Sequence, residues 1–96
     1  MATKEERAAL LEAIEEGEYA PELLAEADDS LKADREIVLE VVKQDGRALW
    51  LADDSLKSDR EVVLAAVKQD GRALKDASEE LQQDEELQKI AEEADG

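Results

Sequence analysis

Two stretches of the chain are nearly identical and follow each other closely. Residues 34–49 read DREIVLEVVKQDGRAL and residues 59–74 read DREVVLAAVKQDGRAL. The copies differ at three positions, Ile37/Val62, Glu40/Ala65 and Val41/Ala66. A period of about 20–50 residues is typical of proteins built from stacked repeats, in which each unit buries its apolar face against its neighbours. The repetition therefore predicts a tandem array, with looser copies at both ends of the chain.

Each copy carries the start and stop signals of one long helix. Asp34 and Asp59 precede an aliphatic run, where a carboxylate can accept the unpaired N–H groups of the first helical turn. Gly46 and Gly71 follow the run, at the place where a glycine in the left-handed conformation often ends a helix. We therefore expect one helix between the aspartate and the glycine of each copy.

A second, shorter helix is expected after each glycine, over residues 47–52 and 72–77. The two DDSLK segments then turn the chain into the next unit. Trp50 and Tyr19 are the only aromatic residues, and the abundant Leu, Ala, Glu and Lys favour helices over strands. The predicted fold is a compact all-α helical-repeat array of the α-solenoid type, with about seven helices that alternate between long and short.

The repeat also predicts how the chain is divided. Its 96 residues are enough for a single domain, covering residues 1–96. We expect an N-terminal capping unit at residues 1–28, two repeats at residues 29–53 and 54–78, and a C-terminal capping helix at residues 79–96. The end units should diverge in sequence because their outer sides meet water.

The charge and composition exclude several classes of function. The chain has 28 acidic and 12 basic residues, a net charge of -16, and neither cysteine nor histidine. Disulfides and thiolate metal sites are therefore excluded, and binding to nucleic acid or to an anionic membrane is disfavoured because both are polyanions. A basic protein is the partner that this charge permits, and a monomer is expected. No signal peptide or membrane-spanning run is evident, so the compartment is unassigned, with the cytoplasm expected for a natural protein.

No residue pattern points to catalysis. The four serines, Ser30, Ser55, Ser58 and Ser78, lie in turn regions, and the chain has no histidine that could activate them. Carboxylate pairs are abundant, yet so many acidic residues produce pairs by chance. We therefore expect no enzyme activity, no catalytic residue and no cofactor.

An acidic edge supplies weak metal candidates. Two aspartate pairs recur one repeat apart, and two glutamates take the corresponding place in the next unit. Carboxylate oxygens are suitable ligands for Ca²⁺. The residues are Asp28, Asp29, Asp53, Asp54, Glu79 and Glu80. No segment has the spacing of an EF-hand loop. We expect a solvated edge that binds cations weakly and without a dedicated site.

Trp50 is an apolar residue at a position where the next copy of the repeat has a charged one. Its counterpart in the next copy is Lys75, which predicts a position that faces water, whereas Leu49 beside it faces the core. Trp50 and Arg47 are therefore the candidate interaction residues. The indole could lie flat on a neighbouring unit and shield aliphatic surface, or it could anchor a partner or self-association, since aromatic residues dominate interface energies.

The motif D-R-E-V-V-L-x-A-V-K-Q-D-G-x-A-L, with ASEEL following at residues 77–81, resembles a known repeat. It is similar to the short tandem α-helical repeat of a bacterial and protist family known only as a domain of unknown function. The resemblance covers residues 34–81. It implies helical repeats and no enzyme, cofactor or catalytic residue. The family often has an aromatic residue where this chain has Leu51 and Asp76, and a carboxylate at the second position suggests a unit adapted toward a terminal cap.

The function expected from these observations is structural. We expect a non-catalytic helical-repeat scaffold with no natural substrate. A designed or engineered origin is favoured because the two central units are almost the same and every helix signal is locally consistent. The alternative is an acidic protein-interaction module that binds a basic partner surface.

Overall fold

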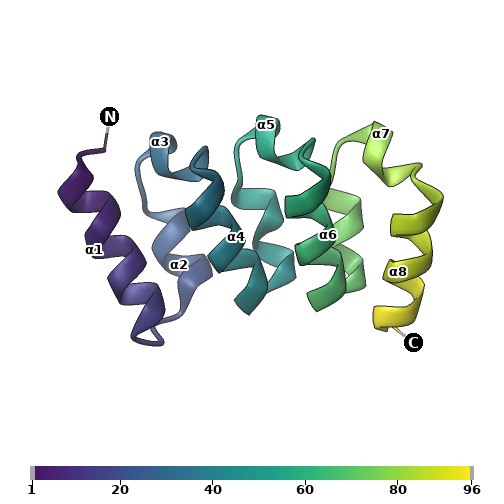
Figure 1. The fold of residues 1–96 in the computed structure, drawn as a ribbon, viewed down its shortest axis with the longest axis horizontal. Helices are drawn as coiled ribbons and strands as arrows, with labels where there is room; N and C mark the ends of the chain where they lie inside the picture. The colour runs from purple at the N-terminus through teal and green to yellow at the C-terminus, as the bar shows by residue number, and fades with distance from the viewer. Residues whose placement is uncertain (1, 96) are drawn as a thin grey trace.

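The chain is all-α in the computed structural model, which describes residues 2–95 (Figure 1). Within those residues it forms eight α-helices and two 3₁₀ helices, with no strand. Their bounds are α1 Lys4–Glu15, α2 Ala20–Ala25, α3 Asp29–Lys32, α4 Arg35–Gln44, η1 Gly46–Leu51, α5 Asp54–Lys57, α6 Arg60–Gln69, η2 Gly71–Asp76, α7 Glu79–Gln82 and α8 Glu85–Asp95. The predicted fold class is therefore confirmed.

The elements are arranged in two layers along a long axis. The trio α3, α4 and η1 recurs as α5, α6 and η2, with every boundary shifted by the same offset along the chain. α1, α4, α6 and α8 pack successively in one layer, and α2, η1 and η2 pack successively in the other. The short helices α3, α5 and α7 follow one edge (Figure 1). The array measures 40 × 24 × 17 Å, with α1 and α8 at its two ends.

The prediction of about seven helices is too low because the turn segments are themselves helical. Each DDSLK segment forms one helical turn, α3 or α5, and its first aspartate caps that turn. Asp28 accepts a hydrogen bond from Ser30 N at 2.9 Å, and Asp53 accepts one from Ser55 N at 3.0 Å. The sequence pattern indicated turns because such short segments are too brief to show helical periodicity.

The caps of the long helices are as predicted. Asp34 accepts hydrogen bonds from the backbone N–H groups of Glu36 and Ile37 at the start of α4. Asp59 does the same for Glu61 and Val62 at the start of α6. Each aspartate thus satisfies two of the backbone donors that a helix leaves unpaired at its first turn.

The prediction of left-handed glycines is wrong. Among residues 2–95 only Gly17 has a positive φ, at 95°. α4 and α6 end instead at the extended residues Asp45 and Asp70, and the following segments form 3₁₀ rather than α-helices. Gly46 is required by close packing, because a Cβ atom there would lie 2.2 Å from the carbonyl oxygen of Ala66. The missing side chain lets η1 rest directly against α6.

The core is aliphatic and lies between the two layers. Adjacent β-branched residues of α4 and α6 are both buried, since each helix is covered by its neighbours and by a 3₁₀ helix. The largest fully buried side chains are Leu24, Ile37, Leu49, Leu87, Val38, Val41, Val42, Val62, Val63 and Val67. Across the described part of the chain, no helix combines the length and hydropathy needed to cross a bilayer.

Candidate functional site

The structure places Trp50 and Arg47 together on the outer face of η1. Trp50 is 61% exposed, as its correspondence with Lys75 predicts, while Leu49 beside it is fully buried. The two candidate residues are three positions apart, which is one turn of a 3₁₀ helix. The Nε atom of Arg47 lies 3.8 Å from Oδ2 of Asp76 in η2, so Arg47 also reaches across to the next unit.

A second exposed aromatic residue was not expected as part of a surface site. Tyr19, just before α2, is 62% exposed, and its hydroxyl donates a hydrogen bond to Oδ2 of Asp45 at 3.2 Å. This hydrogen bond to the carboxylate raises the pKa of Tyr19. Tyr19 was missed because the first unit is out of register with the later repeats, so no offset gave its counterpart.

The acidic edge runs along α3, α5 and α7, and its four aspartates have local structural partners. Asp28 and Asp53 are used as helix caps, and hydrogen bonding to Ser30 and Ser55 lowers the pKa of each. The other aspartate of each pair is fully exposed and forms an ion pair with a lysine in the same turn. These ion pairs are Asp29–Lys32 at 3.8 Å and Asp54–Lys57 at 3.7 Å. Within residues 2–95 no three acidic or other metal-ligating side chains gather into a group that could hold an ion.

A ladder of arginine–carboxylate contacts joins consecutive units. Each arginine meets the capping aspartate of the next long helix and the glutamate two residues after it. The three rungs are Arg7 with Asp34 and Glu36, Arg35 with Asp59 and Glu61, and Arg60 with Asp84 and Glu86. The Nε–Oδ2 distances to the aspartates are 2.5, 2.7 and 3.3 Å. We call this set the arginine ladder.

The arginine ladder fixes the electrostatics of the capping aspartates. Hydrogen bonds from Arg7 and Arg35 hold the pKa values of Asp34 and Asp59 below their usual range. The pKa of Asp84 is lowered first by the backbone N–H of Leu87 and then by Arg60. The two D-R-E triplets carried a signal for the middle rung of this ladder, because stacking two copies sets the arginine of one unit beside the aspartate and glutamate of the next.

Further hydrogen bonds tie the units together through the second layer and the edge. Oε1 of Gln69 accepts a hydrogen bond from Gly46 N at 2.9 Å, and Oε1 of Gln44 accepts one from Ala20 N at 3.4 Å. At the edge, the backbone N–H groups of Asp53 and Ser78 donate to carbonyl oxygens of the preceding short helix at 3.0 Å. The glutamine that begins each QDG motif therefore links two units through a hydrogen bond.

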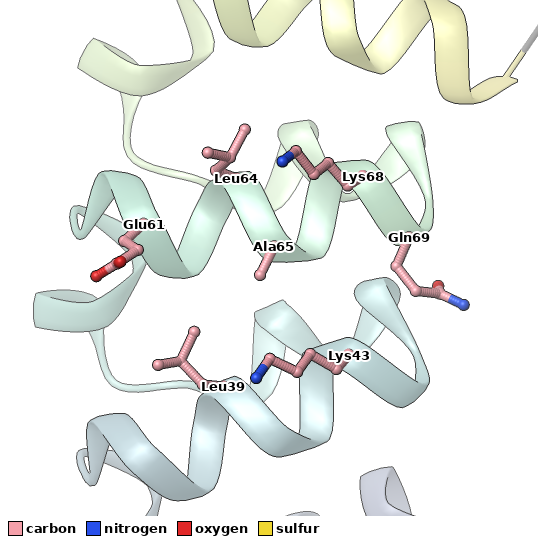
Figure 2. Close-up of a pocket in the computed structure, with 7 residues that line it drawn as sticks. All are labelled: Leu39, Lys43, Glu61, Leu64, Ala65, Lys68 and Gln69. Carbon is pink, nitrogen blue, oxygen red and sulfur yellow. The ribbon is translucent and has the colours of Figure 1, made fainter.

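An open groove of about 590 Å³ lies between α4 and α6 (Figure 2). Its lining includes the half-buried aliphatic residues Leu39, Leu64 and Ala65. Lys43 and Lys68 lie along it, and Figure 2 shows Leu39 and Ala65 pointing into the space between the helices. The lining can contact apolar groups and anions, but it contains no nucleophile paired with a base.

Comparison with known proteins identifies the family. A family model described as Domain of unknown function (DUF4116) matches residues 10–57 and 59–91. No curated protein and no solved structure matches the chain. The two matched segments take in all of α2 to α7 and most of the chain. The chain therefore belongs to the DUF4116 family of domains of unknown function.

Proposed function

We propose that the chain is a non-catalytic scaffold made of tandem helical repeats, with no natural substrate of its own. The arginine ladder is the observation that carries this proposal. Its three rungs repeat the same contact at three successive junctions, which is what a nearest-neighbour repeat array requires. At each junction the arginine contacts a helix-capping aspartate, so these charged groups have a structural role.

The sequence of the two central units supports a designed or engineered scaffold. Between residues 34–49 and residues 59–74, only three positions differ. The differences leave the caps, the QDG motif and the ladder residues unchanged. Consensus repeats are built in this way because identical junctions make units interchangeable.

Interchangeable units give a direct test. A second copy of residues 54–78, inserted after Ser78, should form the same junctions and extend the array. We expect a higher urea midpoint and a larger m-value, because the longer array exposes more surface on unfolding. A control insert of equal length, with the sequence of residues 54–78 scrambled, should not raise the midpoint. A separate low-urea transition for the genuine insert would contradict the proposal.

The alternative is an acidic module that binds a basic partner. It is supported by the edge of α3 and α5, where the carboxylates of Asp29 and Asp54 have side-chain exposures of 101% and 100%. Immobilised protein should then retain basic proteins at low salt and release them at high salt. The variant Asp29→Asn/Asp54→Asn should retain less than Glu12→Gln/Glu15→Gln, which removes two charges from α1. Equal losses for the two variants would assign the retention to net charge alone.

A further inference from the structure

We propose that the outer face of the layer formed by α2, η1 and η2 pairs with the same face of a second copy of this chain, with Trp50 at the two-fold axis. This inference goes beyond the scaffold role and does not depend on it. The composition favours a monomer in dilute solution, so the pairing is expected only as the concentration rises.

The geometry begins with three elements side by side. α2 contacts η1, and η1 contacts η2 (Figure 1). Each element buries one side against the long helices and leaves the other side exposed. The exposed charged and aromatic residues are Glu22 on α2, Glu26 directly after it, Arg47 and Trp50 on η1, and Arg72 and Lys75 on η2. These six residues define the outer face.

The charge of the outer face changes sign along the array. Glu22 on α2 and Glu26 at its C-cap supply two carboxylates, while Arg72 and Lys75 supply two cations on η2. Arg72 is paired within its own unit with Asp70 at 2.7 Å, and Arg47 lies 3.8 Å from Asp76. Among the described residues no ion pair holds the ammonium group of Lys75 or the carboxylates of α2. Both ends of the face therefore have charges available to a partner.

The spacing makes the outer face complementary to itself. α2 lies beside η1 on one side and η2 lies beside it on the other, so acid and base flank Trp50 on opposite sides. A two-fold rotation about an axis through Trp50, parallel to η1, sets α2 of one copy over η2 of the other. The perpendicular in-plane axis would set acid over acid. The charge pattern thus selects one closed, isologous arrangement.

Trp50 supplies the apolar centre of this arrangement. Its indole is 61% exposed on a chain whose other aromatic, Tyr19, is also at the surface. Two copies related by the axis bring their indoles together, and buried aromatic residues at an interface centre contribute most of its binding energy. The remaining acidic surface opposes association, and this repulsion is screened over about 8 Å at physiological ionic strength.

Sedimentation equilibrium tests the proposal, over about 10 µM to about 1 mM, where weak dimers populate. The unmodified chain should form dimers as concentration rises, and Trp50→Lys should stay monomeric. Glu26→Lys and Lys75→Glu should each weaken association about tenfold or more, because each places like charges face to face. The double variant Glu26→Lys/Lys75→Glu should recover the association, since swapping both charges restores complementarity.

Matched variants on the other layer separate the face from net charge. Glu12→Lys on α1 and Lys68→Glu on α6 change the net charge by the same amounts and should leave association unchanged. Circular dichroism checks that every variant is folded, which the exposure of the substituted residues favours. A chain that stays monomeric throughout the range, or a double variant that fails to recover, would overturn the proposal. An equal loss for Lys68→Glu and Lys75→Glu would also overturn it.

Discussion

The 3₁₀ helices η1 and η2 begin with the same four residues and yet differ in burial. η1 reads GRALWL and η2 reads GRALKD. Leu49 in η1 is fully buried, whereas Leu74, the corresponding residue of η2, is only half-buried. The last two residues of η1, Trp50 and Leu51, are apolar, whereas the last two of η2, Lys75 and Asp76, are charged.

The position of each 3₁₀ helix in its layer explains this difference. η1 lies between α2 and η2, and η2 has η1 on one side and no further 3₁₀ helix on the other within residues 2–95. The same local sequence therefore buries different amounts of surface according to its place in the array. In a stacked protein the neighbours, and not the local residues, decide how much a leucine contributes.

The comparison predicts unequal costs for the same substitution. Leu49→Ala should lower the free energy of unfolding by about 3 kcal/mol or more, because it empties a fully enclosed position. Leu74→Ala should cost about half as much, because the position is already partly solvated. Urea denaturation of both variants measures the difference. Equal losses of stability in the two variants would contradict the idea that burial by neighbouring units sets how much each leucine contributes.

Gly46 gives the next largest effect, through the contact of η1 with the following unit. Gly46→Ala should cost about 2–3 kcal/mol, since the new Cβ atom would lie 2.2 Å from the backbone oxygen of Ala66 and must push η1 away from α6. Gly17→Ala is the matched control, because its surroundings are open and only its φ of 95° opposes a side chain. We expect that variant to lose about 1 kcal/mol. A Gly46→Ala loss no larger than the control would contradict the close-packing account.

η1 and η2 also show what the sequence could predict and what it could not. The N-terminal caps, the aliphatic core and the exposure of Trp50 follow from patterns within one unit or from a residue and its counterpart. The role of Gly46 was mispredicted because a helix-ending glycine and a close-packed glycine look alike in sequence. The arginine ladder and the half-burial of Leu74 depend on how units stack, which local periodicity does not record.

Substitutions at Asp59 should have a moderate effect on stability, and two of them separate its helix cap from its ion pair with Arg35. Asp59→Ala removes both the helix cap and the pairing with Arg35, and should cost about 1–2 kcal/mol. Asp59→Asn keeps a capping oxygen and removes the charge, so its cost should be only about 0.5 kcal/mol. Thermal and urea unfolding at neutral pH compare the two.

The lowered pKa of Asp59 adds a pH signature to this pair of variants. A carboxylate with a depressed folded pKa stabilises the protein above its unfolded pKa, about 4, and loses that contribution as the pH falls through the folded value. The stability difference between the unmodified chain and Asp59→Asn should therefore be constant from pH 7 to about 5 and vanish in stronger acid. A difference that persists unchanged at about pH 2 would show that the ion pair with Arg35 contributes nothing.

The smallest effect on stability is expected when the last residue of η1 or η2 is replaced by its counterpart in the other helix. Asp76 stands where η1 has Leu51, and its Oδ2 atom is buried without a hydrogen-bond partner in the described structure, with Arg47 Nε at 3.8 Å. Asp76→Leu removes this unsatisfied oxygen and adds apolar contact, so it should raise the free energy of unfolding by about 0.5–1 kcal/mol. The reverse substitution, Leu51→Asp, should lower it by more, because η1 is enclosed on both sides and the new carboxylate would lack the arginine. If Asp76→Leu destabilises the chain instead, the contact with Arg47 outweighs the buried oxygen, and η2 is a junction in its own right rather than the polar end of its layer.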